Sequence, residues 1–313
     1  MTGKLVCLSG GVGAAKFLQG LIRVAPQEDV TIIVNTGDDV CLYGLHVSPD
    51  LDIVMYTLAG LVDEEKGWGI RDDTFYCLDM FQKYGLETWF KLGDKDLATH
   101  IYRTQLMKGG LSLDQVTQKL CSALGLMVKI LPMTNDKVTP RIITNAGEMH
   151  FEEYLVKRGA VDRVLNVVFD GAESSRPAPG VIESIRDANA VILCPSNPIV
   201  SIGPILAVNG IRESLIKTKA RVIAISPIVG GVTIKGPADK LMNGLGLEVS
   251  AYSVALLYRD LLDMFIFDEI DIREKQKIEG LDVKAFTANT VMRTLEDKIE
   301  LARLALEAVE WQP

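Results

Sequence analysis

A glycine-rich turn with the sequence SGGVGAAK, residues 9–16, follows an apolar run and precedes a helix-like segment. Because free backbone N–H groups and the positive end of a helix dipole meet at such a turn, Gly10, Gly11 and Gly13 are candidates for binding a phosphate. The turn is not a Walker A loop, since Ala15 replaces its second glycine, nor a full dinucleotide fingerprint, since Lys16 replaces its third. A tight turn that binds no ligand remains an open alternative.

Carboxylates gather after a second apolar run, at Asp38 and Asp39, and again shortly afterwards at Asp50 and Asp52. Carboxylate oxygens are ligands that Mg²⁺ prefers, and the ion usually shares them with a phosphate. The alternative is structural, with Asp38 and Asp39 as solvated turn residues and Asp50 as a helix N-cap. On spacing alone the structural alternative is favoured.

A proline-rich loop at 194–204, CPSNPIVSIGP, follows a third apolar run. Its prolines, Pro198 among them, fix the backbone, and Ser196, Asn197 and Ser201 supply hydroxyl and amide groups that can hold a ligand by hydrogen bonds. A rigid structural loop is the alternative, but the density of polar groups favours binding.

The segment 91–100, KLGDKDLATH, leads into a predicted helix. Cations before a helix N-terminus oppose its dipole, which favours an anionic partner for Lys91 or Lys95. A structural or surface role is expected for His100, as for His46 and His150. No Ser/His/Asp or Cys/His set can be assembled from the spacing, so nucleophilic catalysis is disfavoured.

Four short apolar runs, at 4–8, 30–34, 190–194 and 221–225, predict strands covered on both faces, as in a parallel sheet with helices on each side. The ligand loops above would then meet beyond the carboxyl ends of these strands. We expect an α/β fold with a Rossmann-like, mostly parallel sheet, helices on both faces and an added, mainly helical subdomain.

Further patterns predict helices over 73–84, 96–108 and from a Ser112–Gln115 capping box to Gly125, then short strands within 127–170, which include MHFEEYLV. A late strand at 264–267 and a helix within 290–309 are also expected. The predicted domains are a nucleotide-binding core, 1–62 with 160–313, and an inserted helical and small-strand subdomain, 63–159.

The composition, with 48% hydrophobic residues and a net charge of −8, argues against electrostatic binding to nucleic acid. An anionic substrate would therefore need local positive groups or a metal. The five scattered cysteines form no C-x-x-C pair, so neither a disulfide framework nor a zinc site is indicated and a cytoplasmic location is expected. No apolar run suits a signal peptide or a membrane span.

Several long segments resemble the CofD family of 2-phospho-L-lactate transferases, which act in the biosynthesis of the deazaflavin coenzyme F-420. They are SGGVGAAKFLQGL, VNTGDDVCLYGLHVSPDLD, WGIRDDTF, KLGDKDLATH, CPSNPIVSIGPIL and ISPIVGG, which follow one another in the family's order from the first strand to about residue 268.

This resemblance implies a Mg²⁺-dependent transfer in which the ribityl hydroxyl of the deazaflavin Fo attacks the β-phosphate of a guanosine-diphospho-lactate type donor and GMP leaves. It also implies a homodimer. The glycine turn, Asp38 and the SNP loop would bind the substrates, with the turn and the loop holding the donor. By the same resemblance, Asp39 and Asp50 would lie at the metal and acceptor side, and Lys95 would contact the deazaflavin or the donor.

Two other classes of function stay open. An NAD-dependent oxidoreductase would use the first strand, turn and helix with Asp38, but the third glycine and a partner for hydride transfer are missing. A guanine-nucleotide or flavin-binding module without catalysis would bind the ligands and release no GMP. The identity of the three-carbon group on the donor is open too.

Overall fold

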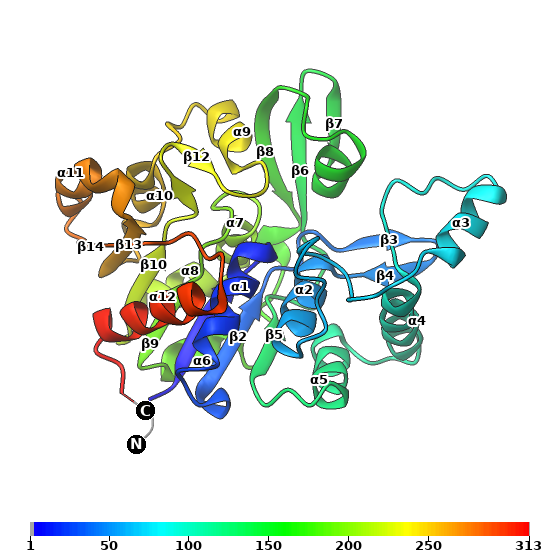
Figure 1. Ribbon diagram of the computed structural model, residues 1–313, viewed down its shortest axis with the longest axis horizontal. Helices are drawn as coiled ribbons and strands as arrows, with labels where there is room; N and C mark the ends of the chain where they lie inside the picture. The colour runs from blue at the N-terminus through cyan, green and yellow to red at the C-terminus, as the bar shows by residue number, and fades with distance from the viewer. Residues whose placement is uncertain (1–2, 313) are drawn as a thin grey trace.

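Seven parallel strands form the central sheet in a computed structural model that describes residues 3–312 (Figure 1). Their spatial order is β14-β13-β10-β9-β1-β2-β5, and the strands span Leu5–Ser9 (β1), Val30–Val34 (β2), Lys129–Pro132 (β5), Ala190–Leu193 (β9), Arg221–Ile225 (β10), Met264–Asp268 (β13) and Lys284–Ala288 (β14). The direction of chain progression reverses between β1 and β9. In open α/β sheets, ligands bind in the crevice at such a reversal. The expected Rossmann-like fold is confirmed.

Helices cover both faces of this sheet because its strands are apolar on both sides. Leu5 and Cys7 pack into one core and Val6 and Leu8 into the other, since successive side chains of a strand point to opposite faces. The first core includes α1 (Gly11–Leu21), α2 (Pro49–Leu58), α5 (Leu113–Ala123) and α12 (Leu295–Ala308). The second includes α6 (Val181–Asp187), α7 (Ile202–Ala207), α8 (Ile211–Lys217), α9 (Ala238–Gly244), α10 (Ala251–Tyr258) and one residue of α11 (Lys275–Glu279).

The helices α1 and α12 lie in close contact (Figure 1). A Cβ added to Gly20 would lie 2.2 Å from the carbonyl oxygen of Lys298, so only glycine permits this approach. The Lys298 ammonium donates to Gln19 Oε1 at 2.6 Å, and the Trp311 indole N–H donates to the Gly3 carbonyl at 2.9 Å. These contacts join the two ends of the described chain.

An arm projects from the sheet on the right of Figure 1. It consists of the hairpin β3 (Val40–Leu42) and β4 (Leu45–Val47) with α3 (Tyr76–Lys83) and α4 (Asp94–Lys108). A second group of elements outside the central sheet is an antiparallel sheet of β6 (Thr139–Thr144), β7 (Gly147–His150) and β8 (Val164–Asp170). A small hairpin pairs β11 (Ile228–Val229) with β12 (Val232–Thr233). Short 3₁₀ segments lie at 27–29, 172–174 and 269–274.

Most predicted elements lie within a few residues of the observed ones. The structure confirms the four strands predicted from apolar runs, which are β1, β2, β9 and β10. It also confirms the late strand, the predicted helices and the Ser112–Gln115 capping box. The strand-like interpretation of MHFEEYLV is wrong for its second half, because Glu153–Lys157 forms a π-helix. The proposed division at 63–159 stays a prediction, and two strands bear on it, since β5 lies in the central sheet and β8 pairs with β6. Within residues 3–312, every helix is too short or too polar to cross a bilayer.

Candidate active site at the crossover between β1 and β9

Asp50 lies in the first turn of α2 with its carboxylate against the first turn of α1. Its Oδ1 accepts the backbone N–H of Gly11 at 2.7 Å, and its Oδ2 accepts the Asn35 amide at 2.9 Å. Burial raises the pKa of Asp50 to about 6, although both hydrogen bonds act in the opposite direction. The N-cap of α2 is Ser48 and Pro49 is its first residue, so the structural alternative of Asp50 as N-cap is wrong.

The glycines of residues 9–16 permit the close approach of α1 to the loop after β9. A Cβ on Gly10 would lie 2.7 Å from the Ser201 Cβ and 2.8 Å from Asp50 Oδ2, and a Cβ on Gly13 would lie 2.3 Å from the Pro195 carbonyl oxygen. Gly11 has a φ of +73°, in the left-handed region that favours glycine. The turn therefore needs all three glycines for its geometry alone.

The loop after β9 is held largely by its own side chains. Asn197 Oδ1 accepts the backbone N–H groups of Ile199 and Val200 at 2.9 and 3.3 Å, and Ser196 Oγ accepts that of Gly10 at 3.4 Å. Among the predicted site residues, the structure thus brings Gly10, Asp50, Ser196 and Ser201 together. Pro198 instead lines a separate apolar pocket together with α7, α8 and α10.

The two carboxylate oxygens of Asp39 differ in their contacts. Its Oδ2 contacts His46 Nε2 and accepts the Ser48 hydroxyl, each at 2.8 Å, whereas its largely buried Oδ1 has no hydrogen-bond partner among the described residues. Burial raises the Asp39 pKa, and the bond from His46 opposes that shift. Sequence reasoning missed this pair, which the β3–β4 hairpin produces through a two-residue turn at Tyr43 and Gly44, both with positive φ.

Two more carboxyl groups complete an acidic cluster, defined here as Asp38, Asp39, Asp50 and Glu152. Asp38 and Glu152 are 4% and 6% exposed, and Asp38 Oδ1 has no partner within residues 3–312. Burial, followed by the charges of Asp50, Glu152 and Asp39, raises the pKa of Asp38. Burial and the Asp50 charge raise that of Glu152 to about 8. No motif in the sequence pointed to Glu152, which is more than 100 residues beyond Asp50.

The acidic cluster suits a hard divalent cation. Its donor atoms are carboxylate oxygens, and Asp38 and Asp39 each retain a buried oxygen that no described group satisfies. Burial and, after it, the charges of neighbouring carboxylates raise the pKa values of Asp38 and Glu152, and a bound Mg²⁺ would neutralise that charge. We find that the residues fit the expected ion.

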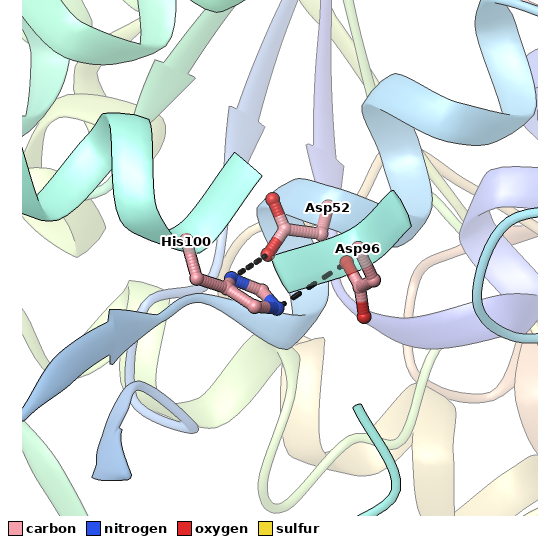
Figure 2. Close-up of side chains that lie close together, drawn as sticks. All are labelled: Asp52, Asp96 and His100. Atoms are coloured by element: carbon pink, nitrogen blue, oxygen red, sulfur yellow. Dashed lines mark ion pairs between the residues drawn. The ribbon is translucent and has the colours of Figure 1, made fainter. Parts of the chain in front are cut away.

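Among the described residues, the one group of three whose ligand atoms all lie within 4.8 Å of one another is a different one, Asp52, Asp96 and His100 (Figure 2). His100 Nε2 lies 3.2 Å from Asp96 Oδ1, and His100 Nδ1 lies 3.7 Å from Asp52 Oδ2. However, the Arg103 guanidinium contacts both oxygens of Asp52 and lies 3.2 Å from His100 Nδ1, and the Tyr56 hydroxyl donates to Asp96 at 2.7 Å. A cation would have to displace the guanidinium, so this ion network instead joins α2 to α4.

Lys95 stands at the N-terminus of α4 and holds the preceding loop. Its ammonium donates to the Arg71 carbonyl at 2.9 Å, and its backbone N–H donates to Asp73 at 2.8 Å. Both contacts lie within the segment 71–95, and the structure does not join Lys95 to the acidic cluster by any hydrogen bond or ion pair among the described residues. His100, in the second turn of α4, is buried in the ion network, in line with its expected structural role.

Positive charge gathers near the exposed side of α1. The Lys235 ammonium donates to the Lys66 carbonyl at 3.2 Å, and burial and the nearby charge of Lys16 lower its pKa. Gly67 links this region to the glycine turn, because a Cβ added there would lie 2.6 Å from Lys235 Nζ and 3.7 Å from a methyl group of Val12. Two lysines thus lie beside the N-terminal half of α1, in a chain of negative net charge.

Comparisons with known proteins agree on one family. The family model for 2-phospho-L-lactate transferase CofD matches residues 5–301. The phosphoenolpyruvate transferase of Kitasatospora aureofaciens is 43% identical over 98% of both chains, and the 2-phospho-L-lactate transferase of Methanocaldococcus jannaschii is 39% identical over 97% of both. A solved UPF0052-family protein of Bacillus halodurans has a TM-score of 0.64 at 16% identity, covering 98% of this chain and 99% of its own, which supports the fold.

Proposed function

Because the chain belongs to the CofD family of 2-phospho-L-lactate transferases, the enzymes of coenzyme F-420 biosynthesis, we propose that its acceptor is the deazaflavin Fo. The donor is a guanosine-diphospho compound that carries a three-carbon acid. The ribityl hydroxyl oxygen of Fo forms a bond to the β-phosphorus, the bond from that phosphorus to GMP breaks, and the product is a phosphodiester.

The proposal covers lactyl, enolpyruvyl and glyceryl forms of the donor. Relatives named phosphoenolpyruvate transferase and relatives named 2-phospho-L-lactate transferase are similarly close to this chain, at 43% and 39–42% identity. The overall identity therefore favours no single three-carbon group.

The position of Asp50 at the crossover between β1 and β9 is the observation that carries the proposal. The carboxylate lies at the N-terminus of α1, where backbone N–H groups attract phosphate, and beside the unpaired oxygens of the acidic cluster. A carboxyl group whose pKa is about 6 is suited to accept a proton near neutral pH, so Asp50 takes the proton of the attacking hydroxyl.

Asp39, with Asp38 beside it, would hold Mg²⁺, and Asp50 is the alternative ligand if it does not serve as the proton acceptor. When bound, the ion neutralises the charge that develops on the phosphoryl oxygens. Groups of the protein itself bind and orient the donor. The N–H groups of Val12 and Gly13 orient the diphosphate, since those of Gly10 and Gly11 donate to Ser196 and Asp50. Lys16 and Lys235 offset its negative charge.

The side-chain amide of Asn35 holds the Asp50 carboxylate in position. It donates to Asp50 Oδ2 at 2.9 Å and to the Val200 carbonyl at 3.3 Å, while its own oxygen accepts the Gly37 N–H at 2.9 Å. A single buried side chain therefore joins α2 to the loops after β2 and β9. It fixes the direction in which the Asp50 carboxylate faces the glycine turn.

The test is mass spectrometry of the product after the protein is incubated with Fo, Mg²⁺ and each candidate donor in turn. We expect one donor to give GMP and an Fo adduct, whose added mass identifies the three-carbon group. A protein that gives no adduct with any donor is not a transferase of this kind. Fo or nucleotide binding without GMP release would indicate a binding module, and oxidation of NADH would indicate an oxidoreductase.

The homodimer and the cytoplasmic location remain predictions of the sequence analysis. Light scattering on the purified protein measures the first, because the expected mass is twice the 34.3 kDa of one chain.

A further inference from the structure

The apolar pocket that Pro198 lines has a volume of about 320 Å³ and has no role in the proposed reaction. Residues of β8, α7, α8 and α10 surround it, together with the loop after β9. Its wall is tightly packed at Gly203, since a Cβ there would lie 3.0 Å from Phe169 Cζ and 3.2 Å from the Pro198 carbonyl oxygen. A pocket with such fixed walls is preformed, which lowers the cost of binding a small molecule.

The side chain of Tyr258, the last residue of α10, lines this pocket and carries a polar atom without a partner. Tyr258 is 4% exposed, and its hydroxyl makes no hydrogen bond within residues 3–312. Burial raises the pKa of this phenol, although the positive charge of Arg212 acts in the opposite direction. The hydroxyl therefore keeps its proton near neutral pH and is a buried donor that lacks an acceptor, which is a costly state.

Arg212, in the first turn of α8, is the charged residue among the described residues that line the pocket. Its Nε and Nη2 donate to the two carboxylate oxygens of Asp260, and Nη2 also donates to the Leu257 carbonyl at 3.4 Å. Its Nη1 has no hydrogen-bond partner in the described part of the chain, so two N–H groups are free to bind a ligand. Because Asp260 holds the other side of the planar guanidinium, the direction of Nη1 is fixed.

These two groups define the chemistry of a ligand for the pocket. A carboxylate can accept hydrogen bonds from a phenol and a guanidinium at once, because it has two acceptor oxygens. Most of the remaining wall is carbon, from side chains such as Val167, Ile199 and Leu206, against which a polyphosphate or a sugar would leave polar groups without partners. An aliphatic chain is favoured on the same wall, since its burial removes apolar area from water.

We propose that this pocket binds a small aliphatic monocarboxylate, whose carboxylate accepts from the Tyr258 hydroxyl and from Arg212 Nη1 while its chain lies against the apolar wall. The site is separate from the candidate active site, although one loop contributes to both. Ser196 contacts the glycine turn, whereas Pro198 and Gly203 line the pocket. The inference is independent of the proposed function, because neither Fo nor the donor takes part in it.

Isothermal titration of the full chain with octanoate, in the absence of Fo and donor, tests the assignment. We expect saturable binding with a Kd on the order of 1 mM or lower. Octanamide has the same chain without the charge and should bind about tenfold more weakly, because hydrogen bonds to a charged group are stronger. Butanoate should also bind at least about tenfold more weakly, since it covers less of the apolar wall. Absence of saturable octanoate binding would overturn the proposal.

Tyr258→Phe removes the unpaired hydroxyl and keeps the ring. We expect this variant to bind octanoate about tenfold more weakly without a decrease in the free energy of unfolding, because no hydrogen bond within the described residues is lost. Tyr84→Phe is the matched control, since Tyr84 is 72% exposed and lies outside the pocket. Equal octanoate affinity in Tyr258→Phe and the wild type would contradict the assignment.

Arg212→Met removes the cation and keeps a long apolar side chain. Octanoate and octanamide should bind this variant with similar affinity, because the charge of the ligand no longer meets a guanidinium. Arg186→Met is the control and should keep the preference for octanoate, since Arg186 forms an exposed ion pair outside the pocket. A preference for octanoate that survives in Arg212→Met would show that the pocket is not the carboxylate site. If one variant unfolds, the other decides by the same titration.

Discussion

The backbone N–H of Gly11 donates a 2.7 Å hydrogen bond to the carboxylate of Asp50, so an acidic side chain stands at the N-terminus of the helix proposed to bind phosphate. The helix dipole stabilises this buried charge, while burial opposes it and raises the Asp50 pKa to about 6. The balance leaves a carboxylate that can accept a proton near neutral pH, next to the phosphate site.

Asp50→Asn is expected to lower kcat by about 10²–10⁴-fold, the range that a lost general base usually gives. The amide removes the proton acceptor and opposes the Asn35 amide, yet it leaves the Gly11 bond to an oxygen in place. Product formation at saturating Mg²⁺ and Fo measures the effect. Turnover at the wild-type rate would remove Asp50 from the mechanism.

Gly13→Ala tests the close approach of α1 to the loop after β9. The new Cβ would lie 2.3 Å from the Pro195 carbonyl oxygen, which is backbone and cannot rotate away. We expect a loss of about 1–3 kcal/mol in the free energy of unfolding. Urea denaturation measures it.

Gly280→Ala is the matched control for this substitution. Its φ is −66°, and the nearest atom to an added Cβ is 3.3 Å away, so the cost should be well below that of Gly13→Ala. Equal losses for the two variants would show that the contact with Pro195 has no special importance.

The raised pKa of Glu152 predicts that the metal-free protein becomes less stable as the pH rises. The Glu152 pKa is raised from 4.5 to about 8, so between these values the folded protein keeps a proton that the unfolded chain has released. The free energy of unfolding therefore decreases with pH in this window, by up to about 1.4 kcal/mol per pH unit for one proton. Denaturation in EDTA at pH 5, 6.5 and 8 measures the slope.

Glu152→Gln should reduce that slope, because the variant lacks one of the buried carboxyl groups that exchange a proton in this range; Asp38 and Asp50 still contribute. Glu153→Gln is the control, since the neighbouring carboxylate is partly exposed and only 3.9 Å from the Lys157 ammonium. The interpretation fails if Glu152→Gln and wild type lose stability equally between pH 5 and 8.

Arg103→Met should destabilise the protein by about 3–5 kcal/mol, because it leaves the buried Asp52 carboxylate without its guanidinium partner. Arg186→Met provides the comparison, since the Arg186–Asp187 pair is 68% and 48% exposed and its loss should cost less than about 1 kcal/mol. Thermal and urea unfolding measure both variants. Similar losses would mean that the ion network between α2 and α4 does not hold the arm.

Removal of Mg²⁺ with EDTA should abolish adduct formation, and added Mg²⁺ should restore it. We expect Asp39→Asn to raise the Mg²⁺ concentration for half-maximal rate at least tenfold, since it removes charge from the acidic cluster. His100→Asn should leave that concentration unchanged, although it disturbs the network around Arg103. The opposite pattern would place the metal at Asp52, Asp96 and His100.

The central sheet could be predicted from the sequence because its strands are short, continuous apolar runs that a parallel sheet requires. The glycine turn and the loop after β9 were found for the same reason, since each follows such a run. The role of the glycines was less evident, because the atoms that exclude a Cβ belong to residues 50, 195 and 201.

Glu152 and the His46–Asp39 pair could not be predicted, and the reason is physical. Glu152 follows β7 in a small antiparallel sheet whose position over the site depends on tertiary packing. His46 meets Asp39 only because a tight turn at Tyr43 and Gly44 folds the chain back. The π-helix at 153–157 was missed because its consecutive apolar residues Tyr154, Leu155 and Val156 read like a short buried strand.

The close contact of α1 and α12 at Gly20 has a consequence for biosynthesis. The part of α1 around Gly20 is covered by a helix about 280 residues further along the chain, so this part stays open to solvent while the ribosome makes the intervening segments. Contacts of such sequence separation form late. The nascent protein would therefore present this part of its first helix to chaperones, although α2 can already pack beside it, until α12 emerges and docks.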